Sequence, residues 1–155
     1  MRKRAVAIIM LIAVIMAAFS TALADSRVFI LCDPETPVNV RIKPKIGTKI
    51  TGQLDFGDWV ETDGEEKNGF IHVYAGDAGE GWIHTGYVVD DQPQKVKARA
   101  SVAATGRVKS YKRIGGKRRN WLEVGDEVKV IAMSKEWAFT SKGYIRTKYL
   151  EVWYE

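Results

Sequence analysis

One short phrase occurs twice in this chain of 155 residues, and a second phrase repeats in the same order. Residues 54–60 (LDFGDWV) return 68 residues later as 122–128 (LEVGDEV), and residues 81–88 (GWIHTGYV) return 62 residues later as 143–150 (GYIRTKYL). Two matched blocks in one order indicate one structural unit used twice. Duplicated small modules more often bind ligands than catalyse reactions, because two weak sites on one chain gain avidity.

The first 24 residues have the layout of a secretory signal peptide. A basic start is followed by an unbroken apolar run, and Ala22-Leu23-Ala24 supplies a small-residue cleavage site. We therefore expect residues 1–24 to be removed and the mature protein to be secreted, contacting the membrane only transiently. An uncleaved anchor is the alternative, because the apolar stretch approaches the roughly 20 residues that span a bilayer.

The repeat divides the rest of the chain into two modules of opposite charge. Module 1 (residues 26–89) is joined by a polar, proline-containing linker (90–94) to module 2 (95–155). Residues 25–94 hold six basic and 13 acidic side chains, a net charge of −7, whereas residues 95–155 hold 15 basic and six acidic side chains, a net of +9. This asymmetry predicts either an anionic partner for module 2 or docking of one module on the other.

The pattern of the mature chain predicts an all-β fold. Short runs of branched and aromatic residues are separated by Gly, Asp and Asn at intervals typical of a small sandwich or barrel. Val60 and Thr62 alternate with polar neighbours, as do Val128, Val130 and Ala132, and we expect these five residues to face inward. The glycines at 57 and 125 are expected in tight turns of positive φ.

Several segments of module 1 resemble the bacterial SH3 (Src homology 3-like) domain. They are residues 40–44 (VRIKP), 50–54 (ITGQL), 56–58 (FGD), 69–73 (GFIHV) and 81–83 (GWI). Module 2 resembles the same family from Trp121 onward but departs from it before that point, with two more residues between Arg107 and Leu122 than between Arg41 and Leu54.

The resemblance implies two small SH3-like barrels in tandem. It also implies export and attachment to, or recognition of, bacterial cell-envelope material. Together with the signal peptide, the repeat and the charge split, it leads us to expect a non-enzymatic protein that recognises cell-wall peptidoglycan or an anionic wall polymer such as teichoic acid. The alternative is an extracytoplasmic interaction or regulatory module for an envelope enzyme or other envelope protein. Fold alone does not fix function, which depends on the residues at the binding site.

The candidate ligand-binding residues are aromatic and cationic. Aromatic faces stack on sugars or peptide planes, and five were selected for this reason: Trp59, Trp82, Tyr87, Tyr144 and Tyr149. Trp59 is the strongest of them, because the alternation that buries Val60 exposes it. The cationic candidates lie between residues 107 and 119, in a stretch expected to be a long loop: Arg107, Lys109, Lys112, Arg113, Lys117, Arg118 and Arg119.

The chain offers little for catalysis. Cys32 is the only cysteine and follows an apolar run, so we expect it to be buried rather than paired with a histidine as a nucleophile. His72 alternates with Ile71 and Val73 and is expected to face solvent. No metal site is expected, because clustered His and Cys ligands are lacking and the acidic run of module 1 has no calcium-loop spacing. No cofactor and no nucleic-acid partner are expected either.

Overall fold

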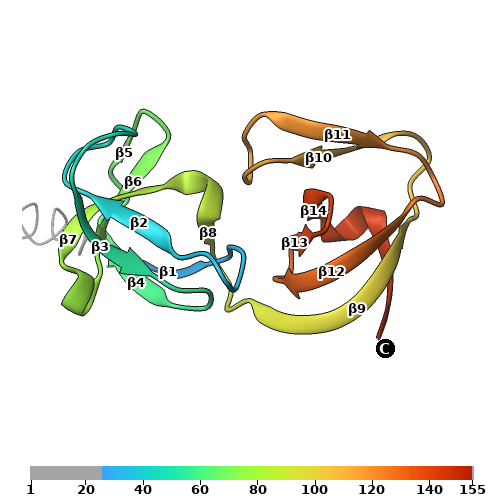
Figure 1. Cartoon of the computed structure of the whole chain (residues 1–155), viewed down its shortest axis with the longest axis horizontal. Helices are drawn as coiled ribbons and strands as arrows, with labels where there is room; N and C mark the ends of the chain where they lie inside the picture. Colours follow the sequence, from blue (N-terminus) through green and yellow to red (C-terminus); the bar gives the residue numbers. More distant parts are fainter. Residues whose placement is uncertain (1–25, 155) are drawn as a thin grey trace, which may run out of the picture.

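The computed structural model describes residues 26–154, which form two β-sheets and three short 3-10 helices (Figure 1). The strands of module 1 are β1 (Ser26–Ile30), β2 (Val38–Arg41), β3 (Ile50–Leu54), β4 (Trp59–Thr62), β5 (Glu66–Lys67), β6 (Phe70–Tyr74), β7 (Glu80–His84) and β8 (Val88–Val89). The strands of module 2 are β9 (Gln94–Val102), β10 (Val108–Tyr111), β11 (Arg118–Leu122), β12 (Glu127–Met133), β13 (Trp137–Thr140), β14 (Gly143–Arg146) and β15 (Leu150–Tyr154). The 3-10 helices are η1 (Gly76–Ala78), η2 (Thr85–Tyr87) and η3 (Thr147–Tyr149).

The two sheets have the same topology, position by position. The first runs β3-β2-β7-β6-β4-β1-β8 and the second β11-β10-β14-β13-β12-β9-β15, and β5 adds to β6 outside this path. Every pairing in both sheets is antiparallel. The predicted fold class is confirmed: the chain is all-β and forms two small SH3-like barrels, which the repeated phrases indicated.

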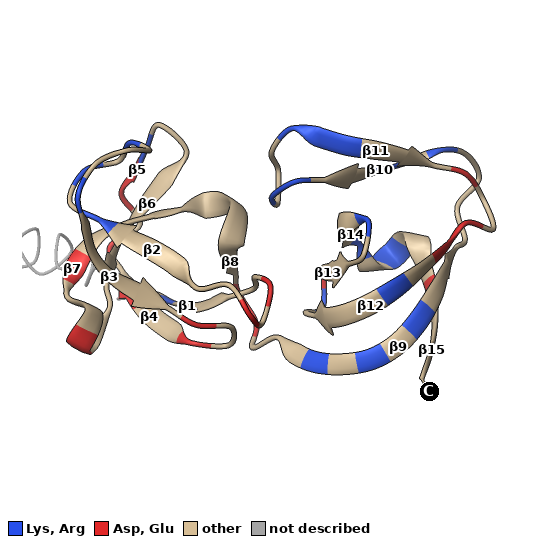
Figure 2. Ribbon diagram, viewed as in Figure 1, with Lys and Arg blue, Asp and Glu red and all other residues tan. Residues whose placement is uncertain are grey.

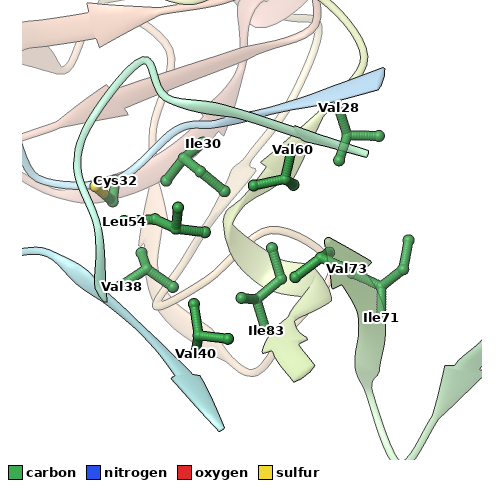
Figure 3. Close-up of a cluster of buried hydrophobic side chains, with 10 residues drawn as sticks. All are labelled: Val28, Ile30, Cys32, Val38, Val40, Leu54, Val60, Ile71, Val73 and Ile83. Atoms are coloured by element: carbon green, nitrogen blue, oxygen red, sulfur yellow. The ribbon is translucent and has the colours of Figure 1, made fainter. Parts of the chain in front are cut away.

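Each barrel has its own apolar core. Ten side chains of module 1 meet in its centre (Figure 3), among them Ile30, Val40 and Ile83, each fully buried. A matching cluster in module 2 includes Val130 and Ile145. The five residues expected to face inward are buried, between 0% and 3% exposed: Val60, Thr62, Val128, Val130 and Ala132. Gly57 and Gly125 have φ of 82° and 86°, as their turns require.

A third apolar cluster joins the two barrels. Leu31 and Val89 of module 1 pack with Ala132, Trp137 and Tyr144 of module 2, and all five are buried. The ion pairs found among residues 26–154 each join residues of one module, so no ion pair among them links the two barrels. The stretch between the modules is short, since β9 already begins at Gln94 and Pro93 is buried.

The basic stretch of module 2 differs from the predicted long loop. It forms two paired strands, β10 and β11, in which Val108 lies opposite Leu122, and its tight tip spans residues 112–117. Because Val38 lies opposite Leu54 in module 1, Val108 is the counterpart of Val38 and Tyr111 that of Arg41. The hairpin of module 2 is therefore two residues shorter than that of module 1, not longer, and the expected alignment of Arg107 with Arg41 was wrong.

The predicted signal peptide lies outside the described residues. Within residues 26–154, no helix has the length and apolar character needed to cross a membrane.

Candidate ligand-binding grooves

Module 2 carries an open groove of about 720 Å³ that is lined by cations and aromatic rings. Four cationic and three aromatic side chains line it, and none of its lining residues is acidic: Arg107, Lys109, Arg146, Lys148, Tyr111, Trp121 and Tyr149. β10 and β11 supply one wall, while β14 and η3 supply the other. The concentration of Lys and Arg on module 2 is visible along the ribbon in Figure 2. Such a lining attracts negative charge and offers flat faces for stacking.

Trp121 is the central aromatic residue of this groove. Its side chain is 43% exposed. The charged groups of Lys109, Arg107 and Arg118 lie 5.3, 5.6 and 5.0 Å from its ring centroid. These separations are within the range in which a cation is attracted to an aromatic face. The cluster therefore presents an apolar ring and several positive charges at one place.

Trp121 was missed in the sequence-based selection, although a signal for it existed. Leu122 repeats Leu54, which faces inward. Because side chains alternate between the two faces of a strand, Trp121, the residue before Leu122, is predicted to face outward. Gln53 occupies that outward position in module 1, and its exposure confirms the inference.

A second concave site, the inter-module cleft, lies between the two barrels and has a volume of about 450 Å³. Module 1 contributes most of its lining, including Asp33, Arg41, Phe70, His84 and Tyr87. Module 2 contributes Lys112, Arg113, Phe139 and Tyr144.

The predicted aromatic candidates have different surroundings. Trp59 is 50% exposed, as expected, and the guanidinium of Arg27 lies 4.0 Å from its ring centroid. Trp82 is half-buried, with its ring 5.0 Å from that of His72. Tyr87 lines the inter-module cleft, and Tyr149 lines the module 2 groove.

Tyr144 is not an exposed binding residue, contrary to the sequence-based selection. It is only 2% exposed and lies in the cluster between the modules, where its hydroxyl donates a hydrogen bond of 3.0 Å to the carbonyl of Leu31. Burial is also the main cause that raises its pKa. Its principal contacts are thus structural, and only part of it reaches the wall of the cleft.

The basic candidates are divided between the two concave sites. Arg107 and Lys109 line the module 2 groove, while Lys112 and Arg113 line the inter-module cleft. Lys117, Arg118 and Arg119 are exposed on the β11 side of the hairpin, and Arg118 approaches Trp121. One continuous stretch of sequence therefore serves two different surfaces.

His72 was expected to face solvent, but most of its side chain is covered. Its Nδ1 lies 2.9 Å from Asp63 and its Nε2 lies 3.2 Å from Glu80, and only 12% of its side chain is exposed. Hydrogen bonds from the Glu65 backbone and from His72 lower the pKa of the Asp63 carboxyl. Asp63, Glu65 and His72 are near enough to one another to hold a metal ion. The ring nitrogens of His72 are already engaged by carboxylates, however, and no second observation points to a metal.

Cys32 lacks the properties of a catalytic nucleophile. It is buried, at 2% exposure, as expected, and its thiol donates to the carbonyl of Asp33. Burial, followed by nearby Asp33, Asp55 and Asp58, raises the pKa of Cys32 to about 12, whereas a reactive cysteine needs a lowered pKa. His84 lines the same cleft, but its Nδ1 accepts a hydrogen bond from the backbone N–H of Gly86 rather than from the thiol.

Comparison with protein families identifies the first module. Residues 36–89 match the family model described as the bacterial SH3 domain. Module 1 is a bacterial SH3 domain. The match covers most of the residues of module 1 that line the inter-module cleft, with Cys32 and Asp33 lying before it, and confirms the family to which the sequence motifs pointed. No curated protein matches the chain.

Two solved structures resemble the chain weakly. NlpC1 from Trichomonas vaginalis is 16% identical, with 85% of this chain and 47% of that one covered, and the TM-score is 0.38. NlpC2 from the same organism is 14% identical, with 84% and 49% covered, and the TM-score is again 0.38. The chain thus spans just under half the length of each, and likeness at this level carries no functional argument.

Proposed function

We propose that this protein is an exported, non-catalytic binding protein that attaches to an anionic cell-wall polymer through the groove of module 2. The observation that carries the proposal is the lining of that groove, which has four cations and three aromatic rings. Two of the cations also contact carboxylates outside the lining, Arg107 that of Glu123 at 3.6 Å and Arg146 that of Glu136 at 2.7 Å. A polymer of sugars or polyols joined by phosphates would place negative charge beside the cations and apolar ring faces against Trp121. The bacterial SH3 domain of module 1 supports a role at the cell wall.

The properties of Cys32 favour binding over catalysis. Its buried thiol and raised pKa of about 12 oppose cysteine-peptidase chemistry. Purified protein is therefore expected to give no cleared zone in a zymogram that contains cell walls, and clearing would contradict this part of the proposal.

Cosedimentation with purified cell walls tests the ligand. Walls that retain teichoic acid should bind the protein, whereas walls stripped of it by hydrofluoric acid should bind at least about tenfold less, because the proposed ligand has been removed. A tenfold loss corresponds to about 1.4 kcal/mol. Binding should weaken as NaCl rises from 50 to 500 mM, because exposed charges are screened. Equal binding to both kinds of wall would overturn the anionic polymer as ligand.

Two tryptophan variants locate the site. Trp121→Ala should reduce wall binding about tenfold or more, which is typical of a central aromatic contact. Trp59→Ala is the matched variant, because it removes a similarly exposed ring that is stacked on an arginine of module 1. An equal loss in both variants would mean that Trp59 also contacts the ligand, and a loss in Trp59→Ala alone would move the site to module 1.

A further inference from the structure

The two concave sites are the same groove in two copies, and one of them is also lined by residues of the other module. In module 1 the N–H of Leu31 donates to the carbonyl of Tyr87, and in module 2 the N–H of Ala103 donates to the carbonyl of Tyr149, at 2.8 and 2.9 Å. Around these bonds, several lining residues of the inter-module cleft have direct counterparts in the module 2 groove: Cys32 and Ala104, Val38 and Val108, Asn39 and Lys109, Arg41 and Tyr111, His84 and Arg146, and Tyr87 and Tyr149. The groove of module 2 remains open, whereas that of module 1 has a second wall.

The second wall is the tip of the β10–β11 hairpin, which reaches module 1 beside η2 (Figure 1). The N–H of Ile114 donates to the carbonyl of Gly86 at 3.0 Å, and Ile114 packs in the cluster between the modules. A Cβ atom at Gly86 would lie 2.6 Å from the Cβ of Arg113, so this approach requires glycine. Module 2 has Lys148 at the equivalent position and cannot accept a hairpin tip in the same way.

The lining of the inter-module cleft holds more positive than negative charge. Arg41, Lys112 and Arg113 line it, and Asp33 is its only carboxylate. Among residues 26–154, none of these three cations forms an ion pair, and Arg41 uses one donor on the carbonyl of Thr48. A guanidinium retains further donors in a planar fork that matches a carboxylate. The cleft therefore has positive charge and hydrogen-bond donors available for one anionic group.

Aromatic rings form part of the remaining lining. Phe70, Tyr87 and Phe139 line the cleft, with the ring of His84 5.2 Å from that of Phe70. Because Nδ1 of His84 accepts from Gly86, the neutral ring carries its proton on Nε2 and adds a donor rather than a charge. Burial and the nearby Arg113 lower the pKa of His84, which favours this neutral form.

We propose that the inter-module cleft binds a single organic carboxylate whose remaining body is apolar or aromatic. The carboxylate pairs with Arg113 and its cationic neighbours, and the apolar body lies against the rings. A volume of about 450 Å³ is within the range of small-molecule sites, about 300–1,000 Å³. Asp33 disfavours a second negative group, which separates this ligand class from the polymer proposed for module 2. Both a free small acid and the C-terminus of a peptide carry this chemistry.

Titration followed by ¹H–¹⁵N NMR tests the site on the whole mature chain. The probes are N-acetyl-phenylalanine, its amide, and the tripeptide N-acetyl-Gly-Gly-Phe with a free or amidated C-terminus. We expect saturable shifts of the Gly86 and Ile114 amides with the free acids and at least tenfold weaker binding of the amides. Comparable binding by both acids indicates a small-acid site, and binding by the tripeptide acid alone indicates a peptide C-terminus. Equal binding of acids and amides, or no saturable binding of either acid, would overturn the proposal.

Two variants measure separately how the charge of Arg113 and the second wall formed by the hairpin tip contribute to binding. Arg113→Gln should weaken binding of the free acid about tenfold while the amide is unaffected, and Lys95→Gln, an exposed change elsewhere in module 2, should alter neither. Gly86→Lys displaces the hairpin tip and should abolish binding while each barrel keeps its dispersed NMR spectrum. Undiminished binding by Arg113→Gln, or by Gly86→Lys with the tip displaced, would contradict the proposed site.

Discussion

Ser110 is fully buried, and its hydroxyl is the one buried side-chain polar atom without a hydrogen-bond partner among the described residues. The counterpart in module 1 is Val40, which is also fully buried and packs in the core of its barrel. A buried hydroxyl that forms no hydrogen bond is destabilising, because it has lost its contacts with water. The comparison of the two modules therefore indicates that this position favours an apolar side chain.

Replacement of Ser110 is expected to stabilise the protein. Ser110→Ala removes the unsatisfied hydroxyl and should raise the free energy of unfolding by about 1 kcal/mol. Ser110→Val copies module 1 and adds apolar contact if the core of module 2 accommodates it. Urea denaturation, with an unchanged slope against denaturant, measures the effect. A destabilised Ser110→Ala variant would show that the hydroxyl has a partner after all.

Cys32 gives the protein a predictable sensitivity to alkali. Its pKa is raised on folding from 9.0 to about 12, chiefly by burial. The folded state thus favours the neutral thiol, and this contribution to stability is complete below pH 9 and decreases as the pH rises from 9 toward 12. The raised pKa of Tyr144 acts in the same direction above pH 10.

Unfolding free energies at pH 8 and pH 10.5 check this expectation. The wild-type protein should lose more stability over that interval than Cys32→Ala, which has no thiol to titrate. Native Cys32 should also react slowly with iodoacetamide at pH 8 and rapidly in urea. Rapid stoichiometric alkylation of the folded protein would contradict both its burial and its raised pKa.

At the scale of the elements, each barrel depends on a close crossing between a glycine of one strand and the neighbouring hairpin. Gly143 at the start of β14 has a φ of 105°, and a Cβ atom there would lie 2.4 Å from the carbonyl oxygen of Tyr111. Gly81 is its counterpart on β7, where a Cβ would lie 2.7 Å from the carbonyl of Arg41. These glycines recur in the repeat because the crossing leaves no room for a side chain.

Gly143→Ala is expected to destabilise module 2 by about 2 kcal/mol or more, because it combines a strained backbone with a steric overlap. Gly106→Ala is the matched control, since a Cβ at Gly106 meets nothing within 4 Å. Thermal unfolding of both variants measures the difference. Similar melting temperatures for the two variants would mean that the strands separate to admit the methyl group at little cost.

At the scale of the whole molecule, the two barrels form one unit rather than independent domains on a flexible linker. Apolar side chains fill the contact, and its polar bonds include those from Tyr144 to Leu31 and from Ile114 to Gly86. The N–H of Lys135 also donates to the carboxylate of Asp91 in the short connecting segment. A contact of this composition couples the two folding equilibria.

The coupling predicts a single unfolding transition whose midpoint changes little between 50 and 500 mM NaCl, because apolar contacts are not screened by salt. Tyr144→Phe leaves the Leu31 carbonyl without its donor and should cost about 1–2 kcal/mol. Calorimetry distinguishes one transition from two. Two transitions would show that the modules unfold independently, and separation of the modules at high salt would show that charge rather than packing joins them.

The sequence was sufficient for the features that depend on neighbouring residues. Alternation along strands placed Val60 and Val128 in the cores, and turns of positive φ required Gly57 and Gly125. The repeated phrases implied one fold used twice, and the identical strand orders bear that out. Each of these patterns lies in residues that are close together in the sequence, so it can be recognised without the tertiary structure.

Only the tertiary structure decided which surfaces are open. The bond from Tyr144 to Leu31 joins residues 113 positions apart, and no local pattern distinguishes a tyrosine that faces solvent from one that faces another barrel. Gly86 and Lys148 occupy equivalent 3-10 helices, yet one receives the hairpin tip and the other cannot. The repeat thus determined the scaffold, while contact between its two copies gave the groove of module 1 a second wall that the groove of module 2 lacks.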